Sequence, residues 1–318
     1  MKVILVGYGE MLRSLASGIL NSQHEIVGVL RQETILRNKI SRFFFDYLSP
    51  SADYLFIKNH SLHEINARSV NSENFRKAVK KLKADVIIVG SWSEKFSAQT
   101  INTIPNGIIN VHPSLLPKYR GPNPYLQVIL NNEQMSGITF HLMNIKYDSG
   151  SILHQKEIPV LPDDTGGSLK IRCCEIARNE VIFLLDNFKS RLINQRSQNE
   201  TEATYQPQIS IKETILDFEN ETAEETDKRI RAFSPWISCY IPIKNEFFKF
   251  QKHKIKKEKV SGTAGTIISK NISENSISVI CKDNSVMKFY DLKINRPFAK
   301  YLSKYFFNKL IDINNRAV

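Results

Sequence analysis

The sequence predicts an α/β protein with a Rossmann-like parallel-sheet domain followed by a small OB-like β-barrel domain. Up to about residue 200, apolar runs alternate with helical patterns, which is typical of a parallel sheet with crossover helices. Further along, short β-like runs are separated by turns, as in a small barrel. The chain has 318 residues, more than the roughly 250–300 at which a single core usually stops growing. Two domains are therefore expected.

The elements expected in the first domain come from short apolar runs, which indicate buried strands, and from apolar residues at helical spacing. The expected strands are Lys2–Val6, Glu25–Leu30, Asp85–Gly90, Gly107–Val111 and Ser136–Met143. The expected helices are Met11–Leu20, Asn74–Leu82 and Ser168–Asp186. No period is clear between Arg31 and Leu62, where Phe43-Phe44-Phe45 favours a surface insertion or a short helix.

The polar segment from Asn187 to Gln206 fits a linker. We therefore expect a first domain over residues 1–190, a linker over 191–208, and a second domain over 209–318 with a divergent tail from Asn295. The second domain is expected to open with a helix over Thr222–Phe233. Its expected strands are Cys239–Ile243, Phe247–Lys254, Gly265–Ser269, Ile277–Lys282 and Val286–Lys293.

Composition narrows the class of protein. The net charge of +12 and the pI near 9.4 favour an acidic partner such as nucleic acid, a nucleotide or a polyglutamylated cofactor. A solvated basic surface is an equally good interpretation. The four cysteines have no CxxC spacing, which favours idle buried thiols in a reducing cytosol and a cytoplasmic protein. No stretch has the roughly 18–20 apolar residues that a membrane span needs, and the apolar start indicates a strand.

The turn Gly7-Tyr8-Gly9 follows the first expected strand, as a dinucleotide-binding turn does. Leu12 replaces the third glycine of the GxGxxG pattern, and no acidic residue stands in a clear ribose-binding position. A tight turn is therefore the favoured interpretation, with a nicotinamide site as the alternative.

Asn110 and His112 stand at the end of a buried strand, where alternate residues face the same side. We expect both to point into the crevice at the carboxyl end of the sheet, where open α/β sheets bind ligands. Asp148 follows another expected strand and can orient an imidazole there. The three side chains together favour acyl transfer without a nucleophilic Ser or Cys. The alternative is an Asn and a His that only close the strand.

Three motifs resemble those of a known family. The stretches NVHPSLLPKYRG from Asn110, GITFHLM from Gly137 and DSGSIL from Asp148 are similar to the folate-dependent formyltransferases. The resemblance implies that Asn110, His112 and Asp148 are catalytic, that 10-formyltetrahydrofolate is the formyl donor, and that no metal is needed. It also implies a set of donor-binding residues at the same crevice: Val89, Gly90, Ser91, Trp92, Ser114, Leu115, Leu116, Pro117 and Gly150.

The resemblance leaves the acceptor amine open, because the family includes enzymes that act on charged tRNA and enzymes that act on amino sugars. Lysines and phenylalanines interleave between Lys244 and Lys259, a composition that suits nucleic acid. The family's tRNA enzymes usually carry a flexible glycine-containing basic loop where this chain has Arg31–Ser51, which lacks glycine. They also usually read Gly-Ala-Ala-Pro where this chain reads Gly121-Pro122-Asn123-Pro124.

These two departures favour a different acceptor, but the full-length second domain and the basic charge make the amino group of methionyl-tRNA the expected one. The alternative is N-formylation of a nucleotide-linked amino sugar for surface polysaccharide. Two other possibilities are water as the acceptor and an RNA-binding protein that keeps this scaffold without catalysis. The sequence does not indicate an oligomeric state.

Overall fold

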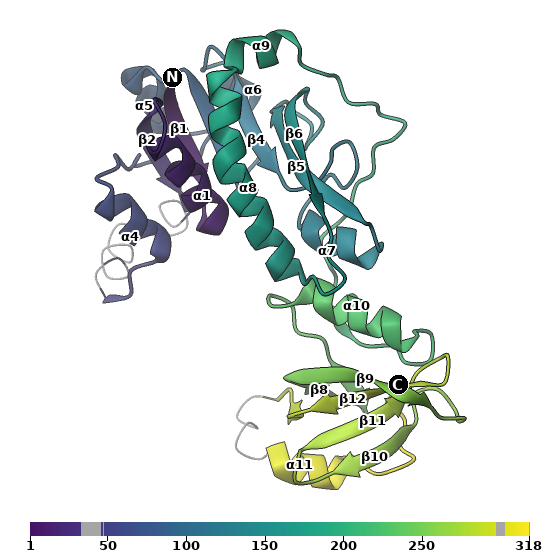
Figure 1. Cartoon of the computed structure of the whole chain (residues 1–318). Coiled ribbons are helices and arrows are strands. Elements are labelled where there is room, and N and C mark those ends of the chain that lie inside the picture. The colour runs from purple at the N-terminus through teal and green to yellow at the C-terminus, as the bar shows by residue number, and fades with distance from the viewer. Residues whose placement is uncertain (33–45, 47, 297–302, 318) are drawn as a thin grey trace. The chain divides into compact units, whose positions relative to one another are not determined.

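Figure 1 shows a computed structural model of the chain, which describes every residue except 33–45, 47, 297–302 and 318. The chain divides into two compact units. The first comprises Met1–Val128, Glu133–Leu161 and Ser168–Pro207, and the second comprises Ile129–Asn132, Pro162–Gly167 and Gln208–Val318. Most of the Arg31–Ser51 insertion, including Phe43-Phe44-Phe45, and part of the tail from Asn295 lie outside the described residues.

A six-stranded sheet forms the centre of the first unit, with strand order β2-β1-β3-β4-β5-β6. The strands are β1 (Lys2–Gly7), β2 (Glu25–Arg31), β3 (Val86–Gly90), β4 (Ile108–His112), β5 (Met135–Leu142) and β6 (Ile152–Pro159). The first four are parallel, whereas β5 pairs antiparallel with β4 and β6 pairs antiparallel with β5. The predicted α/β class with a parallel sheet is confirmed. The sequence did not predict β6, because its charged centre resembles a loop and is typical of an edge strand.

Helices cover both faces of this sheet (Figure 1). The helices up to residue 193 are α1 (Gly9–Leu20), α4 (Ala52–Asn59), α5 (Glu73–Leu82), α6 (Ala98–Ile101), α7 (Pro124–Leu130), α8 (Gly166–Asp186) and α9 (Phe188–Ile193). Helices α1 and α8 pack closely, since a Cβ on Gly18 would lie 2.1 Å from the carbonyl oxygen of Arg178. On α5, Phe75 and Val79 belong to a buried cluster that also contains Ile87 of β3.

The second unit is an antiparallel β structure, as predicted. Its helices are η1 (Lys212–Thr214), α10 (Ala223–Phe233) and α11 (Ser303–Leu310), and its strands are β7 (Ile241–Ile243), β8 (Glu246–Lys249), β9 (Lys252–Lys259), β10 (Ile267–Asn271), β11 (Ser276–Ile280), β12 (Ser285–Tyr290) and β13 (Lys293–Ile294). The strands form two sheets, ordered β10-β11-β12-β9 and β13-β8-β7. Helix α10 begins with a capping box between Thr222 and Glu225.

Two expected strands of this unit are wrong. The stretch Phe247–Lys254 divides because β8 ends at Lys249 and β9 begins at Lys252 in the other sheet. Phe250 lies between them, where the chain passes from one sheet to the other, and packs against Phe289 with ring centroids 4.8 Å apart. The sequence predicted one continuous strand because this apolar residue continues the strand pattern. The stretch Val286–Lys293 divides at Asp291, whose φ of 54° ends β12.

All four cysteines are buried and free, as predicted. Burial raises the pKa of Cys174, Cys239 and Cys281 to about 12, which keeps these thiols protonated and unreactive. Within the described part of the chain, no helix is long and apolar enough to cross a membrane. The same residues contain no cluster of His, Cys, Asp and Glu that could hold a metal ion.

Candidate active site

The structure brings Asn110, His112 and Asp148 together at the carboxyl end of β4. Asn110 and His112 are alternate residues of that strand, and Asp148 lies in the loop between β5 and β6 with a φ of 51°. The amide Nδ2 of Asn110 donates a hydrogen bond to Asp148 Oδ1 at 3.3 Å, and His112 Nδ1 lies 3.7 Å from the same oxygen. The carboxylate therefore faces both other side chains.

His112 is held as a neutral imidazole. Its side chain is buried, and its Nε2 lies 2.8 Å from the carbonyl oxygen of Tyr119. Because a carbonyl oxygen only accepts, Nε2 carries the proton and Nδ1 presents its lone pair toward Asp148. Burial lowers the pKa of His112 below its ordinary 6.5 and outweighs the opposing effect of the Asp148 carboxylate. A neutral Nδ1 at neutral pH can accept a proton.

Asp148 is held as a carboxylate. Burial by itself would raise its pKa, but the positive charge that His112 carries when protonated, the corresponding charge on His141 and the backbone N–H of Gly121 together hold the pKa of Asp148 well below its ordinary value. The Gly121 N–H donates to Asp148 Oδ2 at 2.9 Å. A permanent negative charge beside His112 stabilises the imidazolium that forms when Nδ1 takes up a proton.

His141 is a site residue that the sequence did not predict. It lies opposite Asn110 in the antiparallel pair β4–β5. Its Nδ1 donates to the carbonyl of Leu142 at 2.9 Å, so its Nε2, 3.2 Å from Asn110 Nδ2, is the acceptor. The amide of Asn110 is therefore oriented by two acceptors, His141 and Asp148. The contact depends on the register of an antiparallel pair, which the motif GITFHLM does not reveal by itself.

His141→Ala is expected to lower kcat about fivefold, because the amide of Asn110 loses one of its two acceptors, and a hydrogen bond of this kind contributes about 1 kcal/mol. His141→Gln offers an amide oxygen in place of Nε2 and should restore part of the loss. Steady-state formylation kinetics measure both variants. Wild-type kcat in His141→Ala would show that Asn110 needs no such support.

The expected donor-binding residues at the end of β3 contribute mainly backbone. Val89 belongs to the buried cluster under α5, and the place of a side chain on Gly90 is filled by Met11 and Leu15. Ser91 turns the chain with a φ of 61°. The indole N–H of Trp92 is buried with no hydrogen-bond partner among the described residues. A buried unpaired donor is rare in proteins, so this N–H is a candidate contact for a polar ligand edge.

The expected residues Ser114, Leu115, Leu116 and Pro117 form a loop held from the neighbouring strands. Thr139 Oγ1 of β5 donates to the carbonyl of Ser114 at 2.6 Å, and Gln155 Nε2 of β6 donates to that of Leu116 at 2.8 Å. Gly150 can only be glycine, because a Cβ there would lie 1.7 Å from the carbonyl oxygen of Leu142. The bonds from Thr139 and Gln155 fix the shape of the loop before any ligand binds.

At the Gly7-Tyr8-Gly9 turn, a side chain of the protein bonds the backbone N–H that a phosphate ligand would need. The backbone N–H of Gly9, at the start of α1, donates to Asp53 Oδ2 at 2.6 Å, and Arg13 also bonds the buried Asp53 carboxylate. In dinucleotide-binding folds this helix N-terminus binds a phosphate group. A carboxylate of α4 takes that position here, in agreement with a structural turn.

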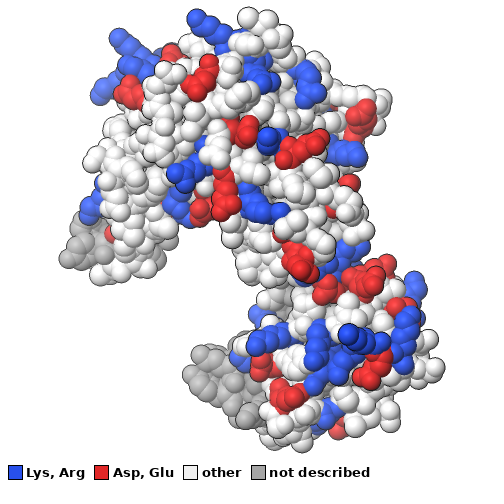
Figure 2. Space-filling view, in the orientation of Figure 1, with Lys and Arg blue, Asp and Glu red and all other residues white. Residues whose placement is uncertain are grey.

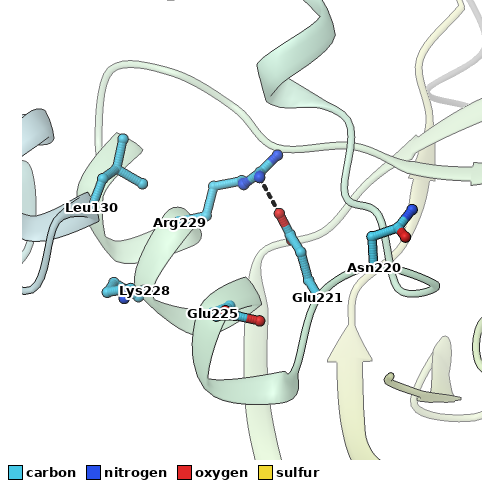
Figure 3. A pocket seen from close by; sticks show the side chains of 6 residues that line it. All are labelled: Leu130, Asn220, Glu221, Glu225, Lys228 and Arg229. Carbon is cyan, nitrogen blue, oxygen red and sulfur yellow. Dashed lines mark ion pairs between the residues drawn. The ribbon is translucent and has the colours of Figure 1, made fainter. Parts of the chain in front are cut away.

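Two hollows lie elsewhere on the described surface. In the second unit, a cavity of about 220 Å³ lies beside α10 (Figure 3), and an ion pair between Arg229 and Glu221 crosses it. Burial raises the pKa of Glu221, and the paired guanidinium opposes this effect. In the first unit, a hollow of about 600 Å³ lies between α5 and α6. Neither is lined by Asn110, His112 or Asp148.

Comparison with known proteins identifies the family. The chain matches the formyl transferase family over residues 2–184 and the C-terminal domain of formyl transferases over residues 208–296. It is 30% identical over 233 residues to the methionyl-tRNA formyltransferase of Thermotoga maritima, an alignment that covers 73% of this chain and 72% of the relative.

Two solved structures share the fold. An N-formyltransferase from Helicobacter canadensis in complex with folinic acid and dTDP-3-aminofucose matches with a TM-score of 0.66 and 19% identity, over 91% of this chain and 99% of that chain. HypX from Aquifex aeolicus in complex with tetrahydrofolic acid matches with a TM-score of 0.65 and 13% identity over 100% of this chain, which spans about half of HypX, 51%. The resemblance inferred from the motifs is confirmed: this chain belongs to the formyl transferase family and is a folate-dependent formyltransferase.

Proposed function

We propose that this chain transfers the formyl group of 10-formyltetrahydrofolate to the amino group of methionyl-tRNA, with Asn110, His112 and Asp148 as the catalytic residues. The observation that carries the chemistry is the neutral His112, whose Nδ1 lies 3.7 Å from the Asp148 carboxylate. This pair can accept a proton from an attacking amine and stabilise the resulting positive charge.

The proposed reaction follows from these contacts. The bound donor supplies a formyl carbonyl. As the amine forms its bond to the formyl carbon, Asn110 Nδ2 gives up its 3.3 Å hydrogen bond to Asp148 and donates that hydrogen to the oxygen that becomes negative. His112 Nδ1 takes the proton that the amine loses, and Asp148 stabilises the imidazolium. His112 returns this proton to the departing nitrogen of the donor as the old carbon–nitrogen bond breaks, so the enzyme ends unchanged.

A lysine-rich edge strand supports methionyl-tRNA as the acceptor. Strand β9 lies at the edge of its sheet and has the sequence KHKIKKEK, with most of its lysines exposed. Lys and Arg side chains gather on this part of the second unit (Figure 2). Among the described residues, Lys256 approaches Glu258 and Lys259 approaches Asp283, each at 3.9 Å, and Lys254 lies close enough to Glu274 to help lower the pKa of that carboxyl. An excess of positive charge along one strand suits a phosphate backbone.

A nucleotide-linked amino sugar is the second candidate. The likeness to the Helicobacter canadensis enzyme, whose structure contains dTDP-3-aminofucose, extends over 91% of this chain. The turn Gly121–Pro124, which differs from that usual in tRNA enzymes, also borders the candidate site, since the Gly121 N–H binds Asp148. Because Asn110, His112 and Asp148 lie together, catalysis is favoured over an RNA-binding protein without activity.

A competition assay decides between the acceptors. With 10-formyltetrahydrofolate as donor, we expect rapid formylation of methionyl initiator tRNA and a kcat/KM at least about 100-fold lower for a panel of dTDP- and UDP-linked amino sugars. Formylation of a sugar nucleotide without formylation of tRNA would replace the proposed acceptor with the alternative. Formate release without either product would identify water as the acceptor.

Replacing Lys252, Lys254 and Lys257 by Gln should raise KM for methionyl-tRNA about tenfold or more and leave kcat unchanged. The slope of log(kcat/KM) against log salt should fall by about one for each lysine that contacts a phosphate. The control replaces Lys80, Lys81 and Lys83 in the first unit by Gln, which removes the same charge. Equal effects of the two triple variants would show that only net charge matters and would contradict a tRNA contact at β9.

A further inference from the structure

Residues 196–206, named the clamp segment here, lie between the two stretches that match the family, which end at 184 and begin at 208. The segment has a linker-like composition but is bound to the first unit. Arg196 and Ile152 exchange two backbone hydrogen bonds of 2.8 and 2.9 Å. Further along, the Arg120 N–H donates to the Thr204 carbonyl and the Gln206 N–H donates to the Arg120 carbonyl, both at 2.9 Å. The segment therefore follows both loops of the candidate site.

Gln198 is the side chain of the clamp segment that reaches both loops. Its Nε2 donates to the backbone carbonyls of Asp148 and Gly150, each at 2.8 Å. Its Oε1 accepts from Nε and Nη2 of Arg120, at 3.1 and 2.8 Å. The amide N–H groups of Gln198 thus bind the loop that carries Asp148, and its amide oxygen binds Arg120 in the loop that carries Gly121.

The same two loops meet at the carboxylate of Asp148. The Gly121 N–H donates to Asp148 Oδ2, and the Tyr119 carbonyl accepts from His112 Nε2. Any shift between the loops would therefore change the carboxylate and the imidazole together. Asp148 also has a φ of 51°, a conformation that is unfavourable for a side chain with Cβ and needs support from its surroundings. Hydrogen bonds to its own carbonyl and to that of Gly150 provide that support.

We infer that Gln198 is a positioning residue, which holds the Asp148 loop against the Tyr119–Gly121 loop and so fixes the carboxylate beside His112 and Asn110. This inference rests on the proposed catalytic role of Asp148. Gln198 itself touches none of the three proposed catalytic side chains; its bonds in this site go to backbone and to Arg120. It acts through the position of Asp148, and small misplacements of catalytic groups are costly in rate.

Two substitutions separate the hold of Gln198 on the Asp148 loop from its contact with Arg120. Gln198→Ala removes all four hydrogen bonds. Gln198→Glu keeps an oxygen for Arg120 but places its second, negatively charged oxygen against the carbonyls of Asp148 and Gly150, so only the hold on the Asp148 loop is lost. Gln195→Ala is the matched control, because Gln195 is exposed in the adjoining chain and, among the described residues, its side chain bonds the nearby Leu192 carbonyl alone.

The full chain is assayed with 10-formyltetrahydrofolate and the acceptor selected by the competition assay. Gln198→Ala and Gln198→Glu are expected to lower kcat about tenfold or more, with KM for both substrates within twofold of the wild type and the thermal unfolding temperature of Gln198→Glu nearly unchanged. Gln195→Ala should match the wild type. If Gln198→Ala unfolds, Gln198→Glu still decides, because it retains the contact with Arg120.

Wild-type kcat in Gln198→Glu would overturn the inference, and so would losses of activity that only follow loss of folded protein. Asp148→Asn in the same assay separates this outcome from failure of the proposed function. An active Asp148→Asn would remove the role of Asp148 itself. An inactive Asp148→Asn beside a fully active Gln198→Glu would leave that role standing and reject only the role of Gln198.

Discussion

His112→Ala is expected to lower kcat by about two to three orders of magnitude while the protein stays folded. The substitution removes the group that takes the proton of the amine and returns it to the departing nitrogen of the donor. General acid–base catalysis of this kind typically contributes about 10²–10⁴-fold to the rate. Asn110→Ala should cause a loss of the same order, because it removes the amide that His141 and Asp148 orient.

The control for this prediction is His63→Ala, which removes an exposed histidine outside the candidate site. Initial rates of formylation at saturating donor and acceptor give kcat, and circular dichroism with thermal unfolding reports the fold. His63→Ala should keep wild-type kcat. More than half of the wild-type activity in His112→Ala or Asn110→Ala would rule out the assigned chemistry.

Asp148→Asn is expected to lower kcat by about two to four orders of magnitude, because an amide of nearly the same shape cannot stabilise the imidazolium of His112. The change also alters the pH dependence of kcat in a defined direction. Burial keeps the pKa of His112 below 6.5 in the wild type, and the Asp148 carboxylate opposes that shift. Without the carboxylate, the pKa of His112 falls further, so the imidazole stays neutral to lower pH. The acid limb of the profile should therefore move to lower pH in Asp148→Asn while the plateau falls.

Profiles of kcat between about pH 5 and 8, with the same acceptor for both proteins, test this result. The amine titrates equally in both, so a difference between the acid limbs reports His112. An acid limb that moves upward in Asp148→Asn would contradict the assignment of His112 as the neutral base.

Local patterns determine much of this protein. Apolar runs and helical periods identify the strands and helices around the sheet, and the helix expected over Thr222–Phe233 is α10, which begins at Ala223 with Thr222 as its N-cap. Alternation along β4 puts Asn110 and His112 on one side, and the general rule for open α/β sheets puts ligands at that edge. Periods and caps depend on neighbours a few residues apart, which is why the sequence alone supplies them.

The tertiary structure decides what surrounds those residues. His141 contacts Asn110 across 31 residues, Asp53 reaches the Gly9 turn across 44, and Gln198 binds the Asp148 loop across 50. Each contact depends on strand register and on the path of a connecting segment. Neither property leaves a local pattern, because a charged edge strand such as β6 and a polar clamp segment have the composition of loops. The sequence by itself determined the fold class, the family and the proposed catalytic residues, whereas only long-range pairing decided which side chains hold them in place.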